Sequence, residues 1–218
     1  MQSGKIFTIT TENAPLKGCT VSREVYNRSG SHIAYYSLDT GTDISPESYA
    51  SRKLLLVSSG RINSGRINTC SRSLSAGEGI ITPVNEPFGI EAVSSAVYTE
   101  ITFDSGGFAM NDSVKAGEVF SLAELVPYQD GRVISMDVAS NPSMKFAVMS
   151  FAEGTGLSEH AAPGDALIFA LDGEGTIGYE GKEYRIKAGE NFRFAKNGRH
   201  YVRAEGRFKM ALLLTLEG

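Results

Sequence analysis

The stretch SEHAAPGDALIFALDGEG, residues 158–175, combines a histidine, a turn of small residues, an apolar run and a glycine-rich segment. The apolar run is short for a helix and ends in glycine, so it predicts a β-strand that leads into a hairpin. The histidine is a candidate metal ligand, because imidazole is the commonest metal ligand in proteins. The stretch therefore predicts a strand with a candidate ligand just before it.

The same pattern occurs earlier in the chain, which contains an internal repeat. LIFALDG at 167–173 aligns with LLLVSSG at 54–60, an offset of 113 residues. AGENFRFAKNGRHYVRA at 188–204 aligns with AGEGIITPVNEPFGIEA at 76–92, an offset of 112 residues. A repeat of this length predicts two copies of one domain.

The two copies are predicted to share an all-β fold. We place them at 1–107 and 108–218, divided within segment 104–112, where two adjacent glycines interrupt a strand. Each copy consists of short strand-like runs separated by Gly, Asn, Pro or charged turns. This pattern predicts two small antiparallel barrels, in which strands of one half could complete the other. Short helical connections are expected at 121–126 and 8–14.

Composition argues against several classes of partner. The 218 residues carry a formal net charge of −4 and no basic cluster, so we expect no binding to nucleic acid or to a membrane. No apolar run approaches the roughly 18 residues of a membrane span, and MQSGKIFTIT has no apolar signal core, so we expect a cytoplasmic protein. Cys19 and Cys70 lack C-x-x-C spacing and are expected to be reduced thiols.

The sequence resembles the cupin superfamily of jelly-roll, or double-stranded β-helix, barrels, and its repeat resembles the two-domain (bicupin) members. The family's first motif carries two histidines and a glutamate between two glycines, and its second motif carries a glycine and a further histidine. Gly154, His160 and Gly173 match the first motif, while Gly189 and His200 match the second. The resemblance covers most of the chain, twice, and implies two tandem cupin barrels.

Two of the four metal-ligand positions of the family are retained in the second copy. The second histidine and the glutamate of the family fall on Ala162 and Ala166. The resemblance implies that His160 and His200 hold one divalent ion, Fe, Mn, Ni or Zn, weakly, or none, because a firmly held metal needs three or four protein ligands. The alternative is that the two imidazoles only form hydrogen bonds inside a polar pocket.

The inward face of the second barrel is the predicted ligand site. Alternate residues of a strand share a face, so His160, Ala162 and Ala166 should point inward. Asp165 should join them only if the chain bulges at Pro163–Gly164. The side chains expected to line this pocket are Ala162, Ala166, Phe194 and Met210.

The first copy lacks both histidines. The residues that align with His160, His200, Ala162 and Ala166 are, in that order, Glu47, Phe88, Tyr49 and Lys53. One carboxylate opposite a phenylalanine cannot bind a metal firmly, and a lysine repels a cation, so we expect this half to be a structural partner. The alternative is an organic-ligand pocket lined by these four side chains.

The leading functional interpretation is a bicupin of undefined specific function that binds a small molecule in its C-terminal barrel. Two alternatives stay open: a metal-dependent cupin enzyme of the dioxygenase or isomerase type, and a structural or sensory protein with no active site. The sequence has no G-x-S-x-G motif and no glycine-rich phosphate loop in a strand-to-helix context, so no catalytic residue is assigned. We expect a monomer or a homodimer.

Overall fold

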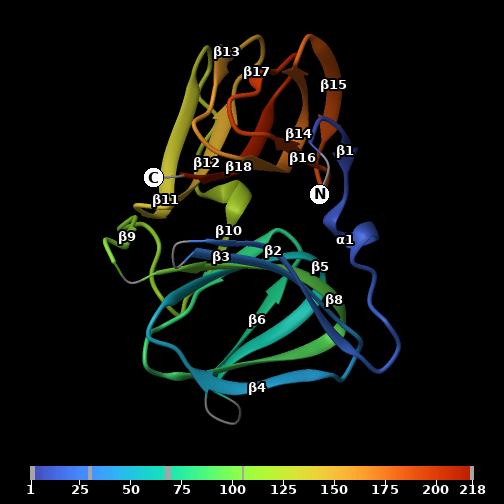
Figure 1. Ribbon diagram of the computed structural model, residues 1–218, viewed down its shortest axis with the longest axis vertical. Helices are drawn as coiled ribbons and strands as arrows, with labels where there is room; N and C mark the ends of the chain where they lie inside the picture. Colours follow the sequence, from blue (N-terminus) through green and yellow to red (C-terminus); the bar gives the residue numbers. More distant parts are fainter. Residues whose placement is uncertain (1–2, 29–30, 67–69, 105, 217–218) are drawn as a thin grey trace. The chain divides into compact units, whose positions relative to one another are not determined.

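The computed structural model of the chain describes residues 3–28, 31–66, 70–104 and 106–216. It divides into two compact units, each built around an antiparallel sheet (Figure 1). The N-terminal barrel comprises Ile9–Phe108 and Asp112–Ser121, and the C-terminal barrel comprises Met1–Thr8, Ala109–Asn111 and Leu122–Gly218. The predicted all-β fold of two jelly-roll barrels is confirmed.

The strands of the N-terminal barrel pair in the order β10-β7-β5-β8-β3-β2, with β4 paired to β8 and β6 to β5. Its elements are α1 (Ile9–Glu12), β2 (Thr20–Arg28), β3 (Ser31–Leu38), β4 (Asp43–Ser48), β5 (Arg52–Arg66), β6 (Cys70–Ser75), β7 (Glu78–Ile81), β8 (Pro87–Phe103) and β10 (Val119–Ser121). The pairing of β5 with β8 shifts register near Ser59. Such bulges bend long strands and let them wrap around a barrel core.

The strands of the C-terminal barrel pair in the order β1-β16-β14-β18-β12-β11-β9, with β13 paired to β17, and β15 and β17 paired to β14. Its elements are β1 (Ile6–Phe7), β9 (Ala109–Met110), η1 (Leu122–Glu124), β11 (Val133–Asn141), β12 (Met144–Phe151), β13 (Gly156–Ala161), β14 (Ala166–Tyr179), β15 (Lys182–Lys187), β16 (Asn191–Phe194), β17 (Arg199–Arg203) and β18 (Phe208–Thr215). β14 and β18 therefore take the places that β5 and β8 hold in the other barrel.

The two barrels exchange one short strand each. β1, from the start of the chain, pairs with β16 of the C-terminal sheet, with Ile6 opposite Phe192 (Figure 1). β10, which follows the first barrel, pairs with β7 of the N-terminal sheet, with Val119 opposite Ile80. The sequence had allowed for strands of one half that complete the barrel of the other half. The boundary between residues 107 and 108 stays a prediction.

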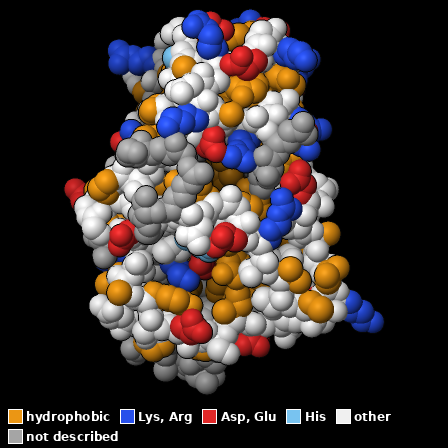
Figure 2. Space-filling view, viewed as in Figure 1, with side chains coloured by type: hydrophobic (Ala, Val, Ile, Leu, Met, Phe, Trp, Pro, Cys, Tyr) orange, Lys and Arg blue, Asp and Glu red, His pale blue; other side chains and the backbone are white. Residues whose placement is uncertain are grey.

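Both predicted helical connections are present and short. α1 is a single turn, and η1 is one turn of 3-10 helix. No helix in the described part of the chain combines the length and apolarity that a membrane span requires. Cys19 is exposed and free, whereas the side chain of Cys70 lies outside the described residues. On the face shown in Figure 2, basic side chains are interspersed with acidic ones rather than gathered.

Candidate functional site

The structure brings the two predicted ligand histidines together. His160 on β13 lies directly opposite His200 on β17, and their ring centroids are 4.3 Å apart. His200 is only 5% exposed, because alternation along β17 turns it inward, whereas His160 is exposed. The Nδ1 atoms lie 2.8 Å from the carbonyl oxygens of Ser158 and Gly198. A carbonyl can only accept, so each Nδ1 donates and leaves Nε2 as the possible ligand atom.

The remaining carboxylates near this pair are engaged elsewhere. Asp165 forms an ion pair with Arg193 and accepts a hydrogen bond from the Lys196 amide. Glu159 accepts a hydrogen bond from Arg199 Nε at 3.0 Å. Across the described ranges, no group of three His, Cys, Asp or Glu side chains is arranged to hold a metal. The donor set therefore does not fit a firmly held divalent ion.

The interior of the C-terminal barrel is packed with apolar side chains. Three residues that were expected to line a pocket there, Ala166, Phe194 and Met210, are at most 2% exposed and belong to its core cluster. The ring of Phe194 stacks on His200 with centroids 4.0 Å apart. Ala162, the fourth, is half-buried just beyond the end of β13. An aromatic ring therefore packs directly against His200 on the inner side of the barrel.

His200 makes the stability of this barrel sensitive to acid. Burial lowers the pKa of its imidazole; the Gly198 carbonyl acts in the opposite direction, and the neighbouring His160 lowers it further. Below the ordinary histidine pKa of about 6.5, the folded state therefore binds fewer protons than the unfolded state. The free energy of unfolding then falls as the pH falls, by at most about 1.4 kcal/mol per pH unit. Tyr179 lies opposite His200 on β14.

We expect the substitution His200→Phe to reduce this dependence on pH. Phenylalanine is the residue at the corresponding position of the N-terminal barrel, so its shape suits the site. Urea unfolding at pH 7 and pH 5, followed by circular dichroism, should show a smaller loss of stability in the variant than in the wild type. An equal loss in both proteins would show that other groups cause the acid sensitivity.

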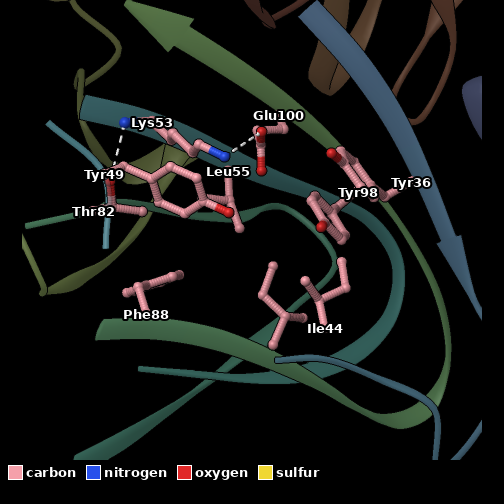
Figure 3. Close-up of a pocket in the computed structure, with 10 residues that line it drawn as sticks. Tyr36, Ile44, Tyr49, Lys53, Leu55, Thr82, Phe88, Tyr98 and Glu100 are labelled. Carbon is pink, nitrogen blue, oxygen red and sulfur yellow. Dashed lines mark hydrogen bonds and ion pairs between the residues drawn. The ribbon is translucent and has the colours of Figure 1, made fainter. Parts of the chain in front are cut away.

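The N-terminal barrel contains a cavity (Figure 3). The centre of a water molecule can reach about 30 Å³ of it, and about 330 Å³ is free of protein atoms when the open mouth is included. It is lined by polar and apolar side chains from β3, β4, β5, β8 and two connecting segments: Tyr36, Ile44, Tyr49, Lys53, Leu55, Thr82, Phe88, Ile90, Tyr98 and Glu100. Three of the four side chains in the alternative sequence interpretation, Tyr49, Lys53 and Phe88, are among them.

A buried ion pair lies at the polar end of this cavity. Lys53 Nζ is 2.9 Å from Glu100 Oε1, with the two side chains 13% and 8% exposed. The same ammonium group lies 3.6 Å from the centroid of the Tyr49 ring, a cation–π contact. Tyr49 donates its hydroxyl proton to Glu47 Oε2 at 2.5 Å, and Glu47 is exposed. Figure 3 shows the apolar side chains of Ile44 and Phe88 at the opposite end.

Two stacked tyrosines complete the polar end. The rings of Tyr36 and Tyr98 are parallel within 1°, with centroids 4.9 Å apart. Burial, together with the negative charges of Glu100 and Glu47, raises the pKa of Tyr36 to about 12. Burial also raises the pKa of Tyr98 well above its usual value. Both are therefore neutral hydroxyls at physiological pH. The Tyr98 hydroxyl is shielded from solvent and has no hydrogen-bond partner among the described residues.

At equivalent positions of the repeat, the N-terminal barrel has polar side chains around its cavity where the C-terminal barrel has apolar ones. Glu47 pairs with Phe88 across β4 and β8 as His160 pairs with His200, in agreement with the offsets of 113 and 112. The same offsets give the C-terminal counterparts of five polar residues that line the cavity. These pairs are Tyr36 with Met149, Lys53 with Ala166, Thr82 with Phe194, Tyr98 with Met210, and Glu100 with Leu212. Sequence reasoning missed Tyr36, Tyr98 and Glu100. The internal repeat could have identified these three residues, because each of them is polar and aligns with an apolar residue of the second copy.

Comparisons with known proteins support the cupin interpretation at the level of the superfamily. Residues 147–216 match a family model described as "Cupin domain". No curated protein matches the chain. A solved cupin 2 conserved barrel domain protein from Leptotrichia buccalis is 29% identical, with a TM-score of 0.86 over 99% of this chain and 98% of that one. Only one cupin domain is matched by the family model, so the two-domain assignment rests on the repeat.

More distant structures share the fold alone. Bacillus subtilis oxalate decarboxylase, as its S161A mutant, is 13% identical with a TM-score of 0.57, over 100% of this chain and 78% of that one. Salicylate 1,2-dioxygenase from Pseudoaminobacter salicylatoxidans is 11% identical with a TM-score of 0.64, over 96% and 80%. Cupin barrels therefore include enzymes, but a shared fold does not assign their chemistry to this chain.

Proposed function

We propose that this chain, which carries a cupin domain and folds as two cupin barrels, is a small-molecule-binding protein with its ligand site in the N-terminal barrel. The observation that carries the proposal is the cavity of Figure 3, in which polar side chains gather at one end and apolar side chains at the other. Small-molecule sites combine apolar walls with a few fixed polar groups that orient the ligand. This moves the proposed site from the C-terminal barrel, which the sequence favoured, to its partner.

The contrast between the barrels supports this choice. Tyr98 and Glu100 keep polar atoms inside the N-terminal barrel, where the matching Met210 and Leu212 of the other barrel are apolar. The buried Tyr98 hydroxyl has no hydrogen-bond partner among the described residues, which costs about 1–3 kcal/mol of stability, so packing alone would favour the apolar residue at this position. A binding role accounts for polar side chains that packing alone disfavours.

A variant that fills the cavity should abolish binding. Thr82 lines the cavity and corresponds to Phe194, so Thr82→Phe copies into this barrel a side chain that its partner already accommodates. Small fragments that bind the wild-type chain in ligand-observed NMR should lose their signal in this variant, because its ring takes their volume.

The matched control is Thr99→Val, on the strand next to Tyr98 but outside the lining. Alternation along the strand turns this residue to the opposite face, so fragment binding should be unchanged. Fragments that bind Thr82→Phe as well as they bind the wild type would show that the site lies elsewhere and would refute the proposal.

The histidine pair supports a second, weaker candidate: a loosely held divalent ion. His160 and His200 face each other with Nδ1 anchored to backbone carbonyls, the arrangement that orients imidazole ligands, but they are two ligands where firm retention needs three. Added zinc should raise the melting temperature of the wild type slightly and leave that of His200→Phe unchanged. Equal shifts in both proteins would remove this candidate and, with it, the metal-dependent enzyme alternative at this site.

A further inference from the structure

We infer that the ligand of the N-terminal cavity is an uncharged small molecule whose polar group is a hydrogen-bond acceptor, such as an amide or another carbonyl. This inference rests on the proposed function and specifies the ligand class of the same site. It depends on how the charges around the cavity are already paired.

The buried charges at the cavity neutralise each other. Lys53 and Glu100 are in direct contact at 2.9 Å, and both are largely withdrawn from solvent. A charged ligand beside them would enter a poorly solvated space without a counter-ion of its own, which is unfavourable. An uncharged ligand avoids that cost.

The groups around the ion pair disfavour either sign of charge. An anion would approach the carboxylates of Glu100 and Glu47, and would be repelled. A cation would seek the aromatic face of Tyr49, but Lys53 Nζ already lies over that ring at 3.6 Å. Glu47 is exposed, so solvent and salt screen the negative charge that it adds near the mouth.

Several of the polar groups that line the cavity can donate a hydrogen bond to a ligand. An ammonium group has three N–H donors and no acceptor, and only one of those of Lys53 is needed for Glu100. Burial keeps the hydroxyls of Tyr36 and Tyr98 protonated, so they can donate as well. A carbonyl oxygen matches these donors better than a donor group does.

The dimensions limit the ligand to a small head group on an apolar body. The centres of water-sized probes reach about 30 Å³ of the cavity, which corresponds to about two water positions, so only a small polar group fits beside the ion pair. The apolar part of the molecule would contact Ile44, Phe88 and Ile90, which also line the cavity. A branched aliphatic amide has this shape.

Three probes with similar branched aliphatic groups test the charge preference. Isobutyramide, isobutyrate and isobutylammonium would be titrated into the full chain at neutral pH, with chemical shifts of the protein and of each probe as readouts. We expect isobutyramide to bind at least about tenfold more tightly than either ion, because each ion lacks a counter-charge. Thr82→Phe should remove the binding and thereby locate it in the cavity.

A change in the charge of the cavity should change the preferred probe. Glu100→Gln leaves Lys53 without its counter-ion, so this variant should prefer isobutyrate. Lys53→Gln leaves Glu100 unpaired, so it should prefer isobutylammonium. Each variant tests the charge preference separately. If neither variant folds, the comparison of the three probes on the wild-type protein still tests the inference.

The outcomes separate the inference from the proposed function. Preference for the amide in the wild type, reversed as stated in the variants, supports the inference. A wild-type protein that binds either ion as tightly as the amide, with binding lost in Thr82→Phe, overturns the ligand class but leaves the cavity as the site. Absence of binding by all three probes overturns the inference, and the fragment experiment on the same variant then decides the proposed function separately.

Discussion

Replacement of Lys53 by alanine should lower the free energy of unfolding of the N-terminal barrel by about 3–5 kcal/mol. The substitution leaves the Glu100 carboxylate, 8% exposed, without the ammonium group that now lies 2.9 Å away. It also removes the cation above the Tyr49 ring. The loss comes mainly from the buried carboxylate that remains, rather than from the ion pair itself, because buried pairs gain little over apolar packing.

The double variant Lys53→Ala, Glu100→Leu separates these two contributions. It copies Ala166 and Leu212, the corresponding residues of the C-terminal barrel, and removes both charges. We expect it to recover most of the stability lost in Lys53→Ala. Because the chain contains no tryptophan, calorimetry and circular dichroism are the suitable probes of unfolding. A double variant no more stable than Lys53→Ala would show that the ion pair holds the barrel together, against the view that it serves a ligand.

Substitution of Gly60 or Gly173 by alanine should destabilise the corresponding barrel by about 3 kcal/mol. The two glycines are equivalent in the repeat, at φ of 74° and 68°, where a side chain strains the backbone. A Cβ atom would also overlap a carbonyl oxygen of the facing strand, that of Ser95 for Gly60 and that of Arg207 for Gly173. Both glycines lie close to a register shift between paired strands, Gly60 between β5 and β8 and Gly173 between β14 and β18.

Gly41→Ala provides the control for backbone strain alone. Gly41 has φ of 77°, but a Cβ atom there would meet no other atom within 4 Å. It should lose only about 1–2 kcal/mol. Calorimetry of the three variants compares the effects directly. Equal losses for Gly60→Ala and Gly41→Ala would show that the carbonyl contact is relieved by a small backbone shift.

The sequence predicted the histidine pair better than its surroundings. The motif spacing identified His160 and His200, and the structure places them opposite each other on neighbouring strands. It did not predict that Arg193 and Arg199 would engage Asp165 and Glu159. Those contacts join residues about 30 to 40 positions apart, and no local pattern in the chain specifies them.

The sequence by itself determined the all-β fold and the equivalence of positions in the two copies. Two constant offsets were enough to align Glu47 with His160 and Phe88 with His200, and the structure pairs each set across neighbouring strands. Even the exchanged strands obey the same offsets, since Ile6 and Phe192 correspond to Val119 and Ile80.

Only the tertiary structure showed which inward-facing side chains form an apolar core and which line a cavity. Periodicity assigns a side chain to the inner face, but the free volume there depends on how side chains from several strands meet. Phe194 and Met210 belong to the core cluster of the C-terminal barrel, whereas Thr82 and Tyr98 at the matching positions line the cavity beside Lys53 and Glu100. Packing in three dimensions, and the ion pair that forms across β5 and β8, therefore decided where a ligand can bind.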